Sequence, residues 1–366
     1  RDVYFHSTVR DGKGVKMSKT LGNFSDAMEL MDRYGTDSVR FTIVYLAPMG
    51  NDVLFDEEKT QIGRNFITKL WNAGRFLLMM KDKTSEANAE QSKNYQKDLT
   101  DKWIESRYNS ALSDAEKYLN EYRLNDYTKA LYSFVWSDYC DWYIELIKIK
   151  INDFPEYAEK IISDAVLYYE NVLKLLHPVI PYVTEELWHI LDDSRASKSI
   201  SFETITGQDE SKINNEIEIN FEQVKEIVTG IRNLRSGNQI PPSKKCDIFI
   251  NVTDIDSKKI IKEYESYIKT LCNLEKLDLT NSKNNENEYA SSIINKYEIY
   301  LSLEGSLDKE KQSEKIKKEI ENLSNYLTGL NKKLSNENFL NKASEEIINS
   351  EKIKQSETLE KLDKLK

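Results

Sequence analysis

EEKTQIGRNFITKLWNAGRFLLMM, residues 57–80, is the stretch that decides the fold. Its apolar side chains recur at spacings of three and four residues: Ile62, Phe66, Leu70, Ala73 and Leu77. Because an α-helix turns once in about 3.6 residues, this spacing places them along one face. The segment is therefore expected to be an amphipathic helix that packs against other helices.

Similar patterns follow further along the chain, over residues 103–119, 124–151 and 157–176, and a short helix is expected from Thr184. The second of these carries a series of aromatic side chains, most of which are expected in the core: Tyr132, Phe134, Trp136, Tyr139, Trp142 and Tyr143. Only 12 glycines and 6 prolines interrupt the 366 residues. The sequence predicts a mainly α-helical protein with a helix bundle over residues 57–195.

Beyond the bundle the pattern changes twice. Residues 196–304 open with a polar linker and continue with alternating helix and strand patterns, which predicts a small α+β module. In residues 305–366, apolar side chains step in a heptad rhythm: Ile316, Ile320, Leu323, Leu327, Leu330 and Leu334. Ile348, Leu359 and Leu362 are expected to line a second helix. Since neither helix can bury its seam alone, an antiparallel coiled-coil hairpin is predicted.

The composition excludes several classes of protein. No stretch reaches the run of about 18 apolar residues that a membrane span needs, so no membrane contact is expected. Cys140, Cys246 and Cys272 are widely spaced, which supports neither a disulfide framework nor a metal site. A reducing, cytoplasmic compartment is the simpler inference. The net charge of −10 argues against uniform coating of nucleic acid but leaves room for local basic faces.

A second decisive stretch is VRDGKGVKMSKTLGN, residues 9–23, in which a strand pattern leads into a glycine-rich turn. Two lysines, Lys16 and Lys19, stand close together on this turn. Lysine is a compact cation on a flexible stem, which suits it to meet negative charge that develops on a departing phosphate group. A solvated surface turn is the alternative interpretation of two lysines alone.

The run from Lys16 to Asn23 resembles the KMSKS signature of the class I aminoacyl-tRNA synthetases, with Thr20 at the final serine position. The resemblance implies that residues 1–56 are the end of a Rossmann-type catalytic domain. It also implies that Lys16 and Lys19 are catalytic, with Lys19 the main contact of the pyrophosphate. The residues implied to bind ATP are Lys16, Met17, Ser18, Lys19 and Thr20.

Within this class, the chain is most similar to the valyl enzymes. The similarity rests on motifs distributed over the whole chain: residues 50–55, 63–73, 137–143, 177–188, 231–235 and 334–343. It implies that valine, ATP with Mg²⁺ and tRNA(Val) are the partners of the complete enzyme, and we expect a monomer. The alternatives are an isoleucyl or leucyl enzyme, or a non-catalytic RNA-binding or coiled-coil scaffold protein.

One family feature is missing. Class I enzymes carry a HIGH-type motif in the first half of the nucleotide-binding fold, and none of His6, His177 and His189 has that setting. The chain is therefore expected to be the C-terminal portion of a larger enzyme and inactive by itself. His177, before Pro178, is expected to end a helix near its negative dipole end.

The resemblance implies that residues 57–195 bind the anticodon and that residues 305–366 form a tRNA-binding arm. Basic or amide side chains suited to phosphate or base edges are the candidate contacts: Arg64, Lys69, Asn72, Arg75, Arg232, Arg235, Lys317 and Lys332. For each of them an ordinary surface or ion-pair role is an equal alternative. Lys315, Lys318 and Lys333 of the arm are further candidates.

Overall fold

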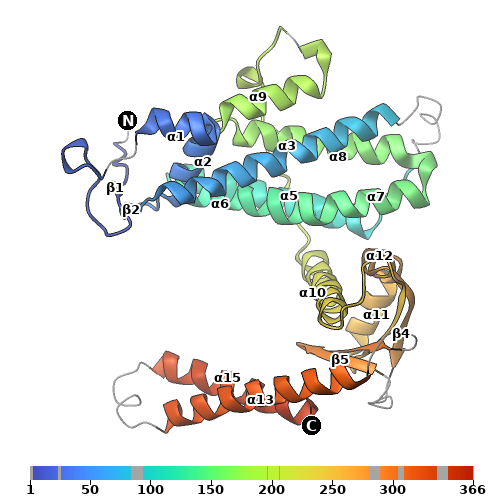
Figure 1. Ribbon diagram of the computed structural model, residues 1–366. Coiled ribbons are helices and arrows are strands. Elements are labelled where there is room, and N and C mark those ends of the chain that lie inside the picture. Colours follow the sequence, from blue (N-terminus) through green and yellow to red (C-terminus); the bar gives the residue numbers. More distant parts are fainter. Residues whose placement is uncertain are drawn as a thin grey trace. The chain divides into compact units, whose positions relative to one another are not determined.

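The computed structural model describes residues 3–23, 26–83, 94–195, 197–205, 207–280, 289–303, 309–335 and 345–365. The chain folds as two compact units, residues 1–222 and 223–366, each described here by itself. Helices dominate the first unit, and the second combines helices with a four-stranded sheet (Figure 1). The prediction of a mainly α-helical protein with a small sheet is confirmed.

The first unit begins with a short parallel pairing of β1 (Val9–Arg10) and β2 (Val53–Leu54). The strand expected before the glycine-rich turn is thus observed at Val9 and Arg10. Between the two strands lie α1 (Ala27–Tyr34) and α2 (Thr36–Leu46), separated by Gly35, whose positive φ of 91° ends α1. These elements share a small apolar cluster: Leu30, Val39, Val53 and Phe55.

The helix bundle follows. Its elements are α3 (Thr60–Lys83), α5 (Leu99–Asn120), α6 (Leu124–Ser133), η4 (Phe134–Tyr143), α7 (Ile144–Asp153), α8 (Ala158–Leu176) and α9 (Pro181–Ile190). The expected core face of α3 is confirmed, since Phe66, Leu70, Ala73 and Leu77 are buried, while Ile62 is half-buried. In Figure 1, α3 lies alongside α8, which it contacts in the core.

Two glycines allow α3 to approach its neighbours closely. A Cβ atom on Gly63 would stand 2.2 Å from the Ser38 carbonyl oxygen of α2, and the Gly63 N–H donates to Thr42 Oγ1 at 3.2 Å. A Cβ atom on Gly74 would lie 2.8 Å from the Tyr169 hydroxyl of α8. The absence of a side chain at Gly63 and Gly74 therefore allows the close approach of α2 and α8 to α3.

The predicted helix over residues 124–151 is one helical run that changes its pitch. α6 passes into the π-helical segment η4 and then into α7 without a break. Phe134, Tyr139 and Tyr143 are buried, and the other predicted aromatic side chains are half-buried. The expectation that most of this aromatic series belongs to the core therefore holds for three of its six side chains. A π-helical segment was not anticipated, because the apolar spacing of the sequence is compatible with an ordinary α-helix.

Residues 194–215, expected to be a polar linker, are fastened to the bundle. Short 3₁₀ turns occur at Ile200–Phe202 and Glu210–Lys212. Ile200 is buried, and its N–H donates to Glu185 Oε1 at 3.3 Å. α10 (Asn215–Gly237) then begins in the first unit and ends in the second.

The second unit contains β3 (Cys246–Asn251), α11 (Ile255–Glu263), α12 (Glu265–Cys272), β4 (Leu274–Thr280), β5 (Tyr289–Ile294) and β6 (Tyr297–Ser302). The sheet has the order β4-β3-β6-β5, with β3 parallel to β4 and antiparallel to β6. Cys246, Ile248 and Ile250 alternate with less buried residues along β3, as predicted for a strand with one covered face. The helical part of this module is divided into α11 and α12 at Tyr264.

The second unit ends with α13 (Lys309–Leu334) and α15 (Glu345–Leu365), which pack against each other. Leu330 and Leu362 are buried, as expected for seam positions. The expectation for Leu359 is wrong, since its side chain is 45% exposed. The buried positions nearby are instead polar: Glu351, paired with Lys333 at 3.2 Å, and Thr358.

Candidate functional site

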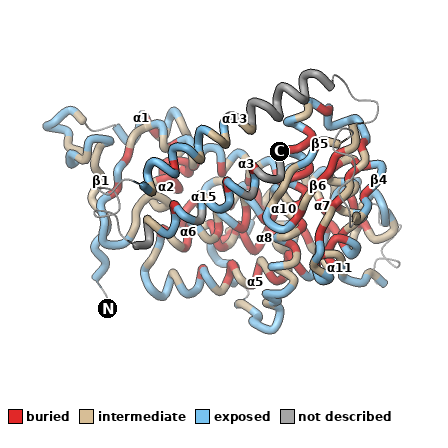
Figure 2. Tube along the Cα trace, turned by 90° about the horizontal axis from the view of Figure 1, so that it is seen from below, coloured by how far each residue is buried: buried red, intermediate tan, exposed pale blue. Residues whose placement is uncertain are grey.

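The loop between β1 and α1 folds back onto β1. The Asp11 N–H donates to the Val15 carbonyl at 2.9 Å, and the Met17 N–H donates to the Val9 carbonyl at 3.1 Å. The backbone therefore forms a narrow hairpin rather than an open turn, with Gly14 at a φ of +80° in its tip. In Figure 2 the segment beside β1 carries the colours of exposed and intermediate residues.

The five residues of the KMSKT motif divide into an inward and an outward set. Met17 packs on the apolar cluster of α1, α2 and β2, so its side chain anchors the loop. Lys16, Lys19 and Thr20 are exposed. Ser18 caps a 3₁₀ turn over Lys19–Leu21, its Oγ accepting from the Leu21 N–H at 3.2 Å. The two ammonium groups thus belong to an ordered loop and face solvent.

Sequence reasoning assigned no role to the residues that hold the loop ends together, Asp11 and Asn23. The Asn23 amide donates from Nδ2 to Asp11 Oδ2 at 2.9 Å and to the Lys16 carbonyl at 3.3 Å. Its Oδ1 accepts from the Ser18 N–H at 3.0 Å. The hydrogen bond from Asn23 lowers the pKa of Asp11, with help from the Val15 N–H. In the sequence, the one sign of this contact was the presence of an asparagine, Asn23, at the end of the motif.

A second attachment joins β1 to the loop before β2. Arg10 pairs with Asp52, and its Nη1 donates to the Gly14 carbonyl at 3.1 Å. The hydrogen bond from Arg10 keeps the pKa of Asp52 below its ordinary value. Arg10 therefore connects the hairpin tip to the segment Gly50–Asp52, which belongs to the motifs that carry the family resemblance.

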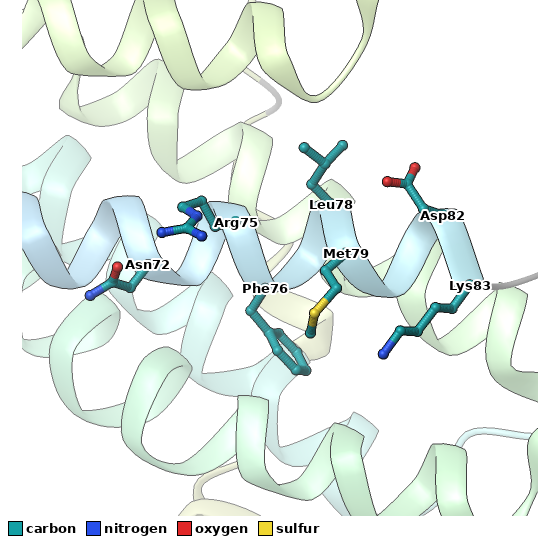
Figure 3. A pocket seen from close by; sticks show the side chains of 7 residues that line it. All are labelled: Asn72, Arg75, Phe76, Leu78, Met79, Asp82 and Lys83. Carbon is teal, nitrogen blue, oxygen red and sulfur yellow. The ribbon is translucent and has the colours of Figure 1, made fainter.

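Three of the four candidate RNA contacts on α3 form an exposed row. Arg64, Asn72 and Arg75 are exposed on α3. A hollow of about 590 Å³ opens on this helix (Figure 3), lined by Asn72, Arg75, Phe76, Leu78, Met79, Asp82 and Lys83. Lys148 of α7 covers the Phe76 ring at 5.2 Å from its centre. The structure thus brings two candidate residues, Asn72 and Arg75, to one concave surface.

The fourth candidate on α3, Lys69, is engaged with the bundle. Its Nζ pairs with Asp141 Oδ1 at 2.5 Å and lies 3.8 Å from the centre of the Trp136 ring. The opposite neighbour of Trp136 is Tyr132, stacked at 5.4 Å. Lys69 therefore has an intramolecular role, which was the alternative interpretation.

In the second unit the structure separates the two candidate arginines. Arg235 is only 5% exposed, and its guanidinium donates to carbonyl groups of two loops, among them those of Pro241 at 2.9 Å and Lys244 at 2.7 Å. The prediction that Arg235 contacts RNA is wrong, because these carbonyls occupy its donors inside the fold. Arg232 remains exposed, although it donates to the Leu271 carbonyl at 3.0 Å.

In the C-terminal helices, Lys332 is exposed. Lys333 is exposed as well and reaches Glu351. The side chains of Lys315, Lys317 and Lys318 lie outside the described residues. Of the candidate tRNA contacts in the arm, Lys332 and Lys333 are therefore described with their side chains, and Lys333 is paired with Glu351.

A corner of the bundle is attached directly to α2. Arg40 donates to the carbonyls of Pro178 and Val179 at 3.1 and 3.0 Å. Asp37 accepts from the Val183 N–H at 2.7 Å and so caps α9 from outside. His177, the residue after α8, contacts Thr184 Oγ1 at 2.8 Å, which agrees with its predicted place at a helix end. The segment that carries the lysine loop and the bundle are therefore joined by polar contacts at the edge of the core.

Within the part of the chain that the structure describes, no group of three or more His, Cys, Asp or Glu side chains is arranged to hold a metal ion. Among the described helices, none has the length and apolar character needed to cross a bilayer.

Family comparisons match three successive parts of the chain. Residues 1–56 match the class I tRNA synthetases for isoleucine, leucine, methionine and valine (I, L, M and V). Residues 101–250 match the anticodon-binding domain of tRNA ligases, and residues 308–366 match the tRNA-binding arm of valyl-tRNA synthetases. The lysine loop falls in the first of these matches, and the exposed row of α3 lies between the first and the second.

Similar proteins of known name agree with these matches. The chain is 37% identical over 368 residues to a valine–tRNA ligase of Chlorobaculum tepidum, covering 98% of this chain and 41% of that protein. It is 38% identical to a valine–tRNA ligase of Aquifex aeolicus, covering 96% of this chain and 31% of that protein. The chain thus spans less than half of the length of these relatives.

A solved structure, the ternary complex of Agrobacterium radiobacter K84 agnB2 LeuRS with tRNA and LeuAMS, matches with a TM-score of 0.45 and 17% identity. This match covers 58% of this chain and 24% of that chain. The assignment rests on the sequence relatives and on the three family matches, which follow one another along the chain in a single order. The chain belongs to the valine–tRNA ligase family of class I tRNA synthetases, and it matches the C-terminal part of those proteins.

Proposed function

We propose that this chain is the part of a valine–tRNA ligase that supplies the KMSKS-type loop and the tRNA-binding surfaces. The complete enzyme would activate valine with ATP and transfer it to tRNA(Val). The observation that carries the proposal is the ordered KMSKT loop, with Met17 packed inward and Lys16 and Lys19 exposed, inside the segment that matches class I synthetases.

The chemistry asks for cations at the leaving group. When the valine carboxylate attacks the α-phosphorus of ATP, a P–O bond forms and the bond to the β-phosphate oxygen breaks, so charge builds up on the departing pyrophosphate. Exposed ammonium groups on an ordered loop can meet this charge more strongly in the transition state than in bound ATP. Lys19 is proposed to make the main contact and Lys16 a second one. Met17 and Ser18 hold the loop that the phosphates approach, and Thr20 is proposed to bind ATP with them.

ATP would enter the complete enzyme with Mg²⁺. The ion would neutralise phosphate oxygens when bound, and the two lysines fit the remaining charge of the phosphates. The residues of this chain then have to orient the loop and to present their ammonium groups to the pyrophosphate.

Amino-acid dependence of ATP–pyrophosphate exchange tests the activity. In the complete enzyme, valine should support exchange, and isoleucine and leucine should support it far more weakly. Isotope exchange supported best by isoleucine or leucine would favour the corresponding synthetase. Absence of exchange with all three amino acids, together with retained tRNA binding, would favour a non-catalytic RNA-binding protein.

We propose that the exposed row of α3, Arg64, Asn72 and Arg75, faces tRNA, with Arg232 and Lys332 as further contacts. What supports the proposal is the exposure of these side chains. The match to anticodon-binding domains, residues 101–250, includes Arg232 and begins after the row on α3. The hollow beside Arg75 offers the apolar surfaces of Phe76 and Met79 to an unstacked base. Lys317 stays a candidate from the sequence, and Lys69 is the weakest of the set because it is engaged with Asp141.

Salt dependence of tRNA binding tests the row on α3. Arg75→Ala in the complete enzyme should weaken tRNA(Val) binding and reduce the slope of log K against log salt by about 1 if one phosphate contact is lost. Arg123→Ala is the control, since that guanidinium is already paired with Glu121 and Asp126. Equal slopes for Arg75→Ala and the unaltered enzyme would remove Arg75 from the tRNA surface.

The C-terminal helices are proposed to form an antiparallel coiled-coil arm that reaches the tRNA backbone. Lys333 of α13 contacts Glu351 of α15, and Asn331, which comes earlier in α13, contacts Gln355, which comes later in α15, at 2.5 Å. The two helices therefore run in opposite directions, as in an antiparallel hairpin. We also propose that the complete enzyme is a cytoplasmic monomer, which sedimentation and fractionation would test.

A further inference from the structure

The lysine loop is closed by an interaction that the motif itself does not contain. Asp11 stands at the first turn of the hairpin and Asn23 follows the motif, so the two residues are separated by the whole loop. Their side chains meet at 2.9 Å, with Asn23 Nδ2 as donor and Asp11 Oδ2 as acceptor. We propose that this pair, called the Asp11–Asn23 clamp, is the positioning device that presents Lys16 and Lys19 to the pyrophosphate.

In both partners of the clamp, every polar atom of the side chain makes a hydrogen bond within the loop. Asp11 Oδ1 accepts from the N–H groups of Lys13 and Val15 at 3.0 and 2.9 Å. Asn23 Oδ1 accepts from the Ser18 N–H at 3.0 Å, and Nδ2 also donates to the Lys16 carbonyl at 3.3 Å. The clamp therefore holds the backbone at Lys16 and at Ser18, the residue that precedes Lys19.

The other attachments of the loop leave this part of it undetermined. Met17 fixes one side chain on the apolar cluster, and Arg10 fixes the hairpin tip through the Gly14 carbonyl. Neither contact involves a residue of the segment from Ser18 to Gly22. Gly22 has a positive φ of 67°, a backbone conformation that glycine adopts without a steric penalty. Without Asn23, the motif would keep Met17 as its anchor and the 3₁₀ turn over Lys19–Leu21, but it would lose the hydrogen bonds that fasten Ser18 and Lys16 to the loop end.

The clamp is expected to affect the reaction rate because ordering a mobile loop costs free energy. A catalytic cation contributes most when its position is fixed before the charge develops, because no ordering is then needed in the transition state. The clamp would supply that order from outside the phosphate-contacting residues. Asp11 and Asn23 are thus positioning residues, and this role rests on the function proposed above for Lys19.

The clamp can be tested by exchanging its two side chains. Asn23→Asp sets two carboxylates against each other, and Asp11→Asn sets two amide donors against each other. The double variant Asp11→Asn, Asn23→Asp restores one donor and one acceptor across the contact, with the polarity reversed. It does not restore the weaker bond to the Lys16 carbonyl, so recovery should be large but incomplete.

In the complete enzyme, each single variant should lower the kcat of valine-dependent ATP–pyrophosphate exchange by about tenfold, the effect of one unsatisfied hydrogen-bonding group. The double variant should recover most of that loss. The KM for valine and the affinity for tRNA(Val) should not change, because the clamp touches only the lysine loop. A variant with damaged folding would instead lose all of these properties together.

Asn51→Asp is the matched control. It makes the same chemical change on an exposed residue of the neighbouring turn, whose N–H donates to the Pro48 carbonyl. Its exchange rate should equal that of the unaltered enzyme. A loss like that of Asn23→Asp would show that added negative charge, rather than the broken clamp, lowers the rate, and would overturn the proposal.

A second readout does not depend on catalysis. Trypsin should cleave after Lys16 and Lys19 several-fold faster in each single variant than in the unaltered enzyme, and the double variant should return towards the slow rate. Unchanged cleavage rates, or a double variant as impaired as the singles, would overturn the clamp. Restored protection in a protein that shows no valine-dependent exchange would support the clamp and contradict the function proposed for the loop.

Discussion

Lysine side chains are used in opposite ways in the loop at residues 9–23 and in the helix bundle. Lys16 and Lys19 are exposed on a hairpin that ordered polar contacts hold in place. Lys150 of α7 is only 2% exposed and pairs with Asp101 at 2.5 Å and with Asp98 at 3.1 Å. Lys150 therefore serves the fold, whereas the exposed side chains of Lys16 and Lys19 can be reached by a ligand.

The bundle cation is part of a helix start. Asp98 and Asp101 form a capping box at the beginning of α5, and Lys150 lies against both carboxylates. Burial raises the pKa of Asp101, while Lys150 acts in the opposite direction. A second buried set, Arg107 with Asp138 and Glu218, fastens α10 to α5 in the same manner. These charges hold helices together and are unavailable to a ligand.

The largest expected effect on folding is at the buried lysine. Lys150→Met should lower the free energy of unfolding by about 3–5 kcal/mol, because two carboxylates would lose their buried partner. Lys148→Met, two residues away on the same helix, removes an exposed pair with Glu145 and should change the free energy of unfolding by less than about 0.5 kcal/mol. Urea unfolding followed by tryptophan fluorescence measures both. Equal effects would contradict the distinction between buried and exposed cations.

The second prediction compares glycines of the two regions. Gly63→Ala places a Cβ atom 2.2 Å from the Ser38 carbonyl, so α2 and α3 must separate, at a cost of about 1–3 kcal/mol. At Gly22 of the loop nothing lies within 4 Å, and the strain of Gly22→Ala comes from the φ of +67° alone.

Thermal unfolding should therefore shift clearly for Gly63→Ala and little for Gly22→Ala, since the loop contributes little buried surface. The exchange rate of the complete enzyme should show the reverse sensitivity. A larger loss of thermal stability at Gly22 than at Gly63 would contradict the view that the loop is only lightly coupled to the core.

The smallest expected effect concerns Asp37, which joins the two regions by capping α9 from α2. Burial raises its pKa above the ordinary 3.8, so the folded protein binds the proton more tightly than the unfolded chain. The contribution of this group to stability is fully present below pH 3.8 and is lost as the pH rises through the raised pKa.

Asp37→Asn keeps an oxygen acceptor for the Val183 N–H and removes that titration. The variant should therefore gain stability relative to the unaltered protein as the pH rises, by about 1 kcal/mol at most. Asp37→Ala, which removes the cap, should cost about 0.5–2 kcal/mol. Denaturation at several pH values tests the trend, and a difference between Asp37→Asn and the unaltered protein that shrinks with rising pH would contradict it.

The sequence predicted the helices well where a long apolar face recurs. The core face of α3 agrees with the spacing of Phe66, Leu70, Ala73 and Leu77, and α8 ends at Leu176 as expected. The prediction of secondary structure failed where the local sequence pattern does not show which strands pair in the folded protein. β4 was missed because its residues do not alternate regularly and its pairing with β3 contains an irregularity at Cys246/Asp247.

Side-chain roles were harder to predict than helices. Arg235 and Arg232 belong to one short motif, yet one is buried among carbonyl groups and the other is exposed. Leu359 was expected in a seam that instead buries Glu351 and Thr358. Burial depends on which elements meet in three dimensions, and no spacing along one helix contains that information. The motif located the lysine loop, whereas its Asp11–Asn23 clamp became visible only through the distances between side chains.

The central claim is that Lys19 acts on the reaction and contributes little to the fold. The most direct measurement compares Lys19→Ala with Lys13→Ala, an exposed lysine of the same loop outside the motif, in valine-dependent ATP–pyrophosphate exchange by the complete enzyme. We predict a fall in kcat of about 10²–10³ for Lys19→Ala, as for loss of one transition-state donor, with unchanged thermal unfolding and no comparable fall for Lys13→Ala. Exchange at the unaltered rate in Lys19→Ala would contradict the account.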